Sequence, residues 1–123
     1  MPARIVVVHN DHAILDPLAD ALHADGHQVV ALDDPLSAWD ALSSECAADV
    51  LITRIRFPTG TPHGVALARR AHANRHQIQV VFIAAPEMEC YTDDLGLFLA
   101  TPVGPKAVLE AVNKMLIANK AAA

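Results

Sequence analysis

The sequence predicts an α/β fold in which a parallel five-stranded sheet lies between two layers of helices. Short β-branched runs alternate five times with segments whose apolar residues recur at helical spacing. Strict alternation of this kind requires parallel strands joined by crossover helices. The 123 residues suit one domain of ordinary size. We therefore expect a single domain over residues 1–123, with an ordered core at about 3–118.

The first strand and helix are marked by a change of hydrophobic period. Ile5–Val8 is a continuous β-branched run, which is typical of a strand buried on both faces. Ala13–Asp25 has the apolar spacing of a helix, and Asp11 or His12 is available as its cap. Gly26 follows at the position where glycine commonly ends a helix.

The middle of the chain repeats the pattern. A second strand is expected at His27–Leu32, and a pair of aspartates before Pro35 opens the next helix. Val50–Thr53 is the third strand. A loop rich in Pro, Gly and Thr runs over Phe57–Gly64, and Val65–Asn74 is helical.

The last third completes five strand–helix units. We expect a strand at Ile78–Ala84, a short and weak helix at Glu87–Leu95, a strand at Leu97–Ala100 and a final helix from Pro105. Five strands favour the flavodoxin-like (βα)5 three-layer sandwich, with strand order 2-1-3-4-5, over a longer dinucleotide-binding sheet. Neither a glycine-rich dinucleotide fingerprint nor a P-loop is present.

Composition excludes several classes of function. The net charge is −5, with no basic run, so binding to nucleic acid is not expected. The longest strongly apolar stretch, Val80–Ala85, is too short to span a membrane. The apolar run near the N-terminus is too short for a signal peptide, so we expect a cytoplasmic protein. Cys46 and Cys90 form no C-x-x-C pair and are expected to be reduced, buried thiols.

The carboxyl ends of parallel strands meet at one edge of a sheet, where ligands and reactants usually bind. The residues expected at this edge are His9, Asn10, Asp11, Arg54, Ala84, Ala85 and Thr101.

Four segments carry a resemblance to a known family. They are Ile5–Asp11, Asp49–Pro58, Val80–Ala85 and Phe98–Pro102. In this order and at these separations they resemble the receiver domains of two-component response regulators, over about residues 3–118. The resemblance implies the fold already expected and a role in signalling.

The resemblance also implies roles for single positions. Family receivers carry two adjacent carboxylates after the first strand, which match His9 and Asn10, and a phosphoryl-accepting Asp that matches Arg54. A Ser or Thr matches Ala84, and a Lys matches Thr101. The following Pro102 is implied to have a cis peptide bond, and a switch aromatic matches Phe98.

The replacements remove the chemistry of the family. Phosphorylation needs a carboxylate nucleophile and a magnesium ion held by oxygens. Arg54 offers neither an acceptor nor a group that loses a proton at neutral pH. Asp11 is the remaining nearby carboxylate and is expected to point into its loop. Arg54 either pairs with Asp11 or fills the vacated pocket and reaches solvent. We expect no catalytic residue, no cofactor and no phosphorylation by the family route.

Histidines offer an alternative site. His9, His12 and His63 all follow strands at the same edge and would form the better metal candidate. His72 and His76 are spaced for one helix face but lack the glutamate of a zinc-protease motif. We expect no metal site in either place.

The most consistent function is therefore a phosphorylation-independent signalling domain, not an enzyme, that binds other signalling proteins or a second copy of itself. The expected contact surface combines the helix at 87–95, the strand at 97–100 and the last helix, with Tyr91, Asp93, Asp94 and Lys106 as contact residues. One alternative is a ligand or metal sensor, or an enzyme, that uses the crevice. A further alternative is a conventional phosphorylated regulator whose positions are aligned differently.

Overall fold

The computed structural model describes residues 3–43, 48–57, 60, 63–74, 77–92 and 95–122. The strands are β1 (Arg4–Val8), β2 (Gln28–Leu32), β3 (Val50–Thr53), β4 (Gln79–Ala84) and β5 (Leu97–Ala100). The helices are α1 (His12–Ala24), α2 (Pro35–Ser43), α3 (Gly64–Asn74), the 3-10 helix η1 (Pro86–Thr92) and α4 (Pro105–Ala122).

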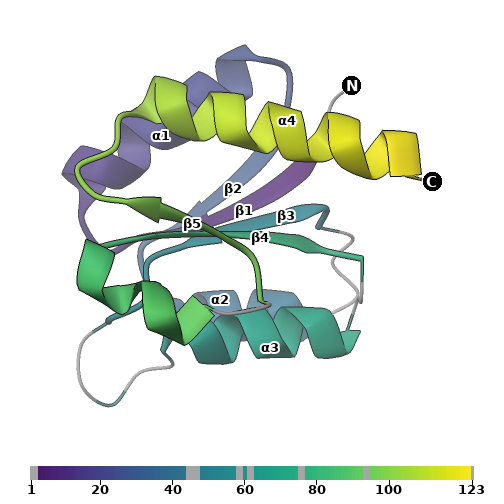
Figure 1. Cartoon of the computed structure of the whole chain (residues 1–123). Coiled ribbons are helices and arrows are strands. Elements are labelled where there is room, and N and C mark those ends of the chain that lie inside the picture. Colours follow the sequence, from purple (N-terminus) through teal and green to yellow (C-terminus); the bar gives the residue numbers. More distant parts are fainter. Residues whose placement is uncertain are drawn as a thin grey trace.

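The sheet has the predicted topology. Its strands are all parallel and lie in the order β2-β1-β3-β4-β5. Helices α1 and α4 cover one face, and α2 and α3 cover the other (Figure 1). The strands end at the edge where η1 lies, and the chain termini lie at the opposite edge (Figure 1). The flavodoxin-like three-layer prediction is confirmed.

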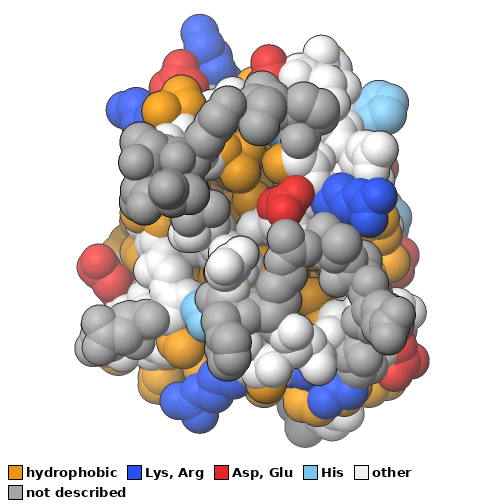
Figure 2. Space-filling view, turned by 90° about the vertical axis from the view of Figure 1, so that its right-hand side faces the viewer, with side chains coloured by type: hydrophobic (Ala, Val, Ile, Leu, Met, Phe, Trp, Pro, Cys, Tyr) orange, Lys and Arg blue, Asp and Glu red, His pale blue; other side chains and the backbone are white. Residues whose placement is uncertain are grey.

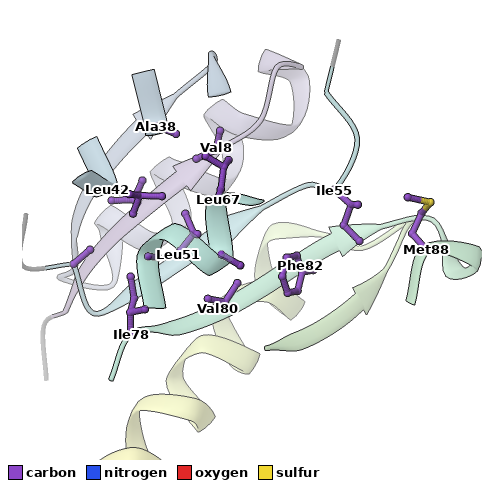
Figure 3. Close-up of a cluster of buried hydrophobic side chains, with 14 residues drawn as sticks. Val8, Ala38, Leu42, Leu51, Ile55, Leu67, Ile78, Val80, Phe82 and Met88 are labelled. Carbon is purple, nitrogen blue, oxygen red and sulfur yellow. The ribbon is translucent and has the colours of Figure 1, made fainter. Parts of the chain in front are cut away.

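The core consists of two apolar layers, one on each face of the sheet. The central strands β1, β3 and β4 carry their buried residues on both faces, as the β-branched runs predict. Figure 3 shows the layer beneath α2 and α3, where Leu51 and Phe82 from the sheet meet Leu67 from α3. The edge strands β2 and β5 are mostly half-buried or exposed. Among the described helices, none combines the length and the apolar character needed to cross a membrane.

The structure at the start of α1 shows which of the two candidate residues, Asp11 or His12, caps the helix. Asp11 has extended backbone, with φ −104° and ψ 109°, and its Oδ1 accepts a hydrogen bond from the Ala13 amide at 3.0 Å. His12 is instead the first helical residue. The helix ends before Gly26, whose φ of 93° lies in the left-handed region that glycine tolerates best.

The segment expected as a helix at Glu87–Leu95 differs from the prediction. It forms the 3-10 helix η1, which ends at Thr92. Only Met88 and Thr92 are buried along it, so little packing is available to stabilise a longer α-helix. The Thr92 hydroxyl donates to the Glu89 carbonyl at 2.8 Å and so satisfies one carbonyl within the short helix.

The edge where the strands begin carries charges of both signs, scattered rather than gathered, as Figure 2 shows. Beneath this edge His27 is buried, with 3% of its surface exposed. Its Nδ1 accepts from the Ala3 amide at 3.0 Å, so the proton lies on Nε2, which donates to Asn113 Oδ1 at 3.1 Å. The Asn113 amide in turn donates to Asp25 at 3.0 Å. This network joins the N-terminal segment, the end of α1 and α4.

Candidate functional site

A crevice of about 430 Å³ opens where the strands end. The expected residues that line it are His9, Asp11, Arg54, Ala84, Ala85 and Thr101. Residues that the sequence did not single out complete the wall, namely Ile14, Ile55, Arg56, Ile83, Glu87 and Met88. Parallel strands bring these segments together, because all five end at one edge.

Asn10, rather than Asp11, is the partner of Arg54. The Arg54 Nη1 atom donates to Asn10 Oδ1 at 2.6 Å, and this bond joins the loop after β1 to the loop after β3. The expected alternatives were an Arg54–Asp11 pair and a solvated guanidinium. No bond between Arg54 and Asp11 is present among the described residues, where Asp11 Oδ1 accepts the amide bond that caps α1, whereas the half-buried Arg54 does line the crevice.

The backbone beneath Arg54 is held tightly. Gly64 is buried and lies against it so closely that an added Cβ would be 2.0 Å from the Arg54 carbonyl oxygen. The Gly64 amide donates to the Ile55 carbonyl at 2.8 Å, and the Thr53 hydroxyl donates to the Arg54 carbonyl at 2.8 Å. The sequence predicted a loop that includes Gly64, but α3 begins at this residue. These contacts fix the position from which the Arg54 side chain enters the crevice.

His9 is the buried polar group of the crevice, with 6% of its surface exposed. Its Nδ1 accepts from the Asp11 amide at 3.0 Å, so the neutral ring carries its proton on Nε2. Burial lowers the pKa of His9 below 6.5 and the Arg54 guanidinium lowers it further, whereas Asp11 acts in the opposite direction. Among the described residues, Nε2 has no hydrogen-bond partner.

The charges of the crevice do not favour a divalent cation. Two arginines, Arg54 and Arg56, and two acidic residues, Asp11 and Glu87, line it. Magnesium requires several oxygen ligands in near-octahedral geometry, usually including carboxylates. One of the two carboxylates is engaged as a helix cap, and the positive charges oppose a cation. Ala84 and Ala85 contribute no hydroxyl to the opposite wall.

The candidate cluster of rim histidines is not found among the described residues. His9 and His63 line different cavities, and the exposed His12 instead contacts Asp16 Oδ1 at 3.2 Å and Asp33 Oδ2 at 2.9 Å. Within the part of the chain that the structure describes, no three His, Cys, Asp or Glu side chains are placed to hold a metal ion. His76 lies outside the described residues, so the His72–His76 pair is not described.

Two smaller expectations can be compared with the structure. The Thr101–Pro102 peptide bond is cis, as predicted. Cys90 is exposed, so the expectation that both thiols are buried is wrong for this one. The short η1 helix buries only two of its residues and leaves this position outside the core. Cys46 lies outside the described residues.

Phe98 is half-buried beside Phe82, its partner in the β4–β5 register, and does not line the crevice.

The expected contact surface carries exposed apolar groups. Tyr91 is 52% exposed, and its ring meets His63 edge to face at 6.3 Å. Lys106 is exposed, and Asp93 and Asp94 lie outside the described residues. Two residues that the sequence did not single out, Leu97 on β5 and Ile117 on α4, are 39% and 69% exposed.

A shallow groove of about 400 Å³ runs between β5 and α4, with Leu97, Glu110, Lys114 and Met115 in its lining. We call the surface made by Tyr91, Leu97, Lys106, Lys114 and Ile117 the partner face. A helical wheel alone does not reveal Ile117, because its exposure depends on how α4 lies on the sheet.

The sequence matches no protein-family model and no curated protein. Solved structures match the fold closely. A CheY-like response regulator receiver domain protein from Methanospirillum hungatei JF-1 has a TM-score of 0.86 and 22% identity, with 100% of each chain covered. A response regulator receiver protein from Sinorhizobium medicae WSM419 has a TM-score of 0.85 and 25% identity over 96% of this chain and 97% of that one.

A third similar structure is the receiver domain of the hybrid histidine kinase CckA, with a TM-score of 0.70 and 25% identity over 92% of this chain and 98% of that one. All three share the five-stranded parallel architecture described above. The chain therefore has the fold of CheY-like response regulator receiver domains.

Proposed function

We propose that this chain is a degenerate receiver domain of a two-component or phosphorelay pathway, one that acts by binding other signalling proteins without being phosphorylated. The supporting observation is Arg54 at the end of β3, where the resemblance places a phosphoryl-accepting carboxylate. A guanidinium has no lone pair available to attack a phosphoryl group. Its bond to Asn10 also engages the loop after β1, where the resemblance places the carboxylates that would hold magnesium.

The remaining positions agree with this proposal. By the resemblance, His9 and Asn10 match the two carboxylates that would hold the cation, and here the His9 ring and the Asn10 amide make hydrogen bonds to the Asp11 amide and to Arg54 instead. Ala84 has no hydroxyl to bond a phosphoryl oxygen, and Thr101 has no positive charge to pair with one. The Asn10–Arg54 bond instead links the two loops. We infer that the crevice keeps one arrangement, and that signalling depends on partner binding, abundance or an unidentified ligand.

The first test is direct phosphorylation. Incubation with acetyl phosphate and Mg²⁺ should add no phosphoryl group by intact-mass spectrometry, under conditions that label a receiver with a phosphoryl-accepting Asp. Labelling of the wild type that disappears in Asp11→Asn would show that Asp11 is the acceptor and that the proposal is wrong.

The partner face is the proposed working surface, for a signalling protein or for a second copy of the chain. Apolar side chains at Tyr91, Leu97 and Ile117 supply contact area, and Lys106 and Lys114 supply charge around them. Asp93 and Asp94 belong to the same proposal on sequence grounds. An isologous dimer would bring each of these residues against the same surface of a second copy.

A double variant tests this surface. Leu97→Glu with Ile117→Glu should abolish partner capture from the native cell, or self-association measured by sedimentation, without unfolding the domain. The matched control is Leu36→Glu, because Leu36 is 51% exposed on α2 and lies away from the partner face. Equal loss in the control would place the working surface elsewhere. Tyr91→Ala with Asp94→Lys provides a second, independent disruption.

A small-molecule sensor is the second candidate, and one observation favours it. The crevice holds about 430 Å³, and within the described part of the chain neither the Arg56 guanidinium nor His9 Nε2 has a hydrogen-bond or ion-pair partner. Such groups bind carboxylate or phosphate oxygens. Thermal unfolding with a panel of small carboxylates and phosphates should then show a stabilising compound whose effect is lost in Arg56→Gln. A panel without any such compound counts against a sensor of this class.

A further inference from the structure

The charges of this protein are segregated along the sequence. The chain has 14 Asp and Glu residues, yet none occurs between Asp49 and Glu87. The same stretch contains most of the arginines of the chain, at positions Arg54, Arg56, Arg69, Arg70 and Arg75. The rest of the protein is therefore strongly acidic, and this stretch, which forms β3, α3 and β4, is basic.

Residues of this basic stretch line a groove between α2 and α3. The groove lies on the face of the sheet opposite to α1 and α4 (Figure 1). The groove has a volume of about 590 Å³, and its polar lining comes from Trp39, His63, Arg69, Arg70 and Asn74. Alanine and valine side chains of α3 form the rest of its wall. No carboxylate lines it among the described residues.

Trp39 is held in a fixed orientation at the α2 side of this groove. The Arg70 guanidinium lies 4.2 Å from the centre of the Trp39 ring, and Arg70 Nε donates to the Trp39 carbonyl at 3.1 Å. The Asn74 amide donates to the Leu42 carbonyl at 2.6 Å and closes the other end of the α2–α3 contact. The groove is therefore pre-organised, which lowers the entropy lost when a ligand binds.

The groove presents hydrogen-bond donors almost exclusively. Arg69 is exposed, and its guanidinium has no ion-pair or hydrogen-bond partner in the described part of the chain. The indole N–H of Trp39 likewise has no partner there. His63 accepts from the Val65 amide through Nδ1 at 3.3 Å, so its proton lies on Nε2. The Oδ1 atom of Asn74 is the one side-chain acceptor of the lining. A complementary ligand must therefore supply acceptor oxygens.

We propose that the α2–α3 groove binds an acidic segment of a partner protein, with carboxylates against Arg69 and Arg70 and an apolar side chain on Trp39. Charge complementarity selects the carboxylates, because arginine pairs with them in bidentate geometry. The apolar wall selects a segment that also carries an aliphatic or aromatic residue. A protein segment suits the groove better than nucleic acid, because its lining offers two arginines beside an apolar wall rather than the row of basic side chains that a phosphate backbone needs.

The single tryptophan of the chain makes the groove directly observable. Titration with a short synthetic Glu/Leu peptide should change Trp39 fluorescence in a saturable way that weakens with salt. A Lys/Leu peptide of the same length should give no change. Arg69→Glu should weaken the binding of the Glu/Leu peptide at least about tenfold, because a charge-assisted bond is replaced by repulsion. Arg69 is exposed and has no hydrogen-bond or ion-pair partner among the described residues, so its variant should keep the wild-type melting temperature.

The control is Arg4→Glu, which makes the same change of net charge at the start of β1 and should bind the peptide within about twofold of the wild type. Equal weakening in both variants would show that net charge alone governs binding and would overturn the proposal. So would the absence of a fluorescence response in the wild type, tighter binding of a DNA duplex than of the peptide, or self-association that Arg69→Glu removes. Because Arg69 lies outside the partner face, failure here leaves the function proposed above independently testable.

Discussion

Two buried histidines lie at opposite edges of the sheet, and they are used differently. His27, beneath the edge where the strands begin, has both ring nitrogens bonded within the protein, to the Ala3 amide and to Asn113. His9, at the edge where the strands end, is almost equally buried but has a partner on Nδ1 only. Its neighbour Arg54 makes one bond, to Asn10, and faces an open crevice.

The difference separates groups that stabilise the fold from groups that are available to bind. A buried polar group whose bonds are all satisfied inside the protein contributes to stability, and its loss leaves its former partners unsatisfied. An N–H of a crevice-lining side chain that has no partner among the described residues can instead bond a ligand or a partner protein. Substitutions in the His27 network, at the edge where the strands begin, should therefore destabilise the protein. Side-chain changes at the crevice, where the strands end, should alter the pKa values of neighbouring groups more than the free energy of unfolding.

The largest expected effect comes from the backbone of the crevice rather than its side chains. In Gly64→Ala the new Cβ would lie 2.0 Å from the Arg54 carbonyl oxygen, which is a backbone atom in a buried position. Relief requires α3 to move away from the loop, so we expect a loss of about 3 kcal/mol or more in the free energy of unfolding. Urea denaturation measures this quantity directly.

Gly104→Ala is the matched control, because a Cβ at Gly104 would meet nothing within 4 Å. It should cost under about 1 kcal/mol, which is the preference for glycine over alanine before the first turn of α4. If the two variants were equally stable, the close approach of α3 to the crevice loop would not be a constraint on the fold.

The next effect tests the two histidines against each other. His27→Ala removes two buried hydrogen bonds and leaves the Ala3 amide and the Asn113 carbonyl oxygen without partners, so we expect a loss of about 2–3 kcal/mol. His9→Ala removes one bond beside the open crevice, where water can reach the freed Asp11 amide, and should cost about 1 kcal/mol.

His23→Ala, at an exposed position in the last turn of α1, is the control and should stay within about 0.5 kcal/mol of the wild type. A cost for His9→Ala that equals or exceeds that of His27→Ala would remove the distinction between the two edges.

These contrasts show which parts of the structure are predictable from sequence. The strands and their order were predicted correctly, because hydrophobic period and helix punctuation are local signals. Strand topology then placed Arg54 and His9 at one crevice. Side-chain pairing was not predictable in the same way. Arg54 bonds Asn10 rather than Asp11, a choice that depends on the loop geometry, and the ring partners of His27 are separated from it by long stretches of sequence. The 3-10 geometry of η1 depends on packing that no local pattern records.

A smaller effect concerns the electrostatics of the crevice. Burial is the larger cause of the lowered pKa of His9, and the Arg54 guanidinium is the second. Arg54→Gln should therefore raise the pKa of His9 while leaving it below 6.5. NMR titration of the imidazole resonances measures the shift, and Arg69→Gln, on the far side of α3, should leave the pKa unchanged. A pKa that stays constant in Arg54→Gln would show that the guanidinium does not act on the ring.

The smallest effect distinguishes two histidines that lie close together in sequence. The pKa of His12 is raised above 6.5, chiefly by its hydrogen bond to Asp33 and then by its bond to Asp16, whereas the pKa of His9 is lowered. The contribution of His12 to stability is therefore fully present below pH 6.5 and is lost as the pH rises through its folded-state pKa. His9 acts with the opposite sign, because the unfolded chain binds its proton more readily, so its effect lowers stability as the pH falls below 6.5.

His12→Gln should remove the pH dependence of stability that comes from His12 and keep the one that comes from His9. Relative to the wild type, the variant should lose stability below pH 6.5 and match it once the pH exceeds the folded-state pKa of His12, with a small difference because His12 and both of its carboxylate partners are exposed. Urea denaturation across this range measures the difference, and added salt should shrink it. A variant that lost stability equally at all pH values would show that His12 acts through uncharged contacts at the start of α1 rather than through its bonds to Asp33 and Asp16.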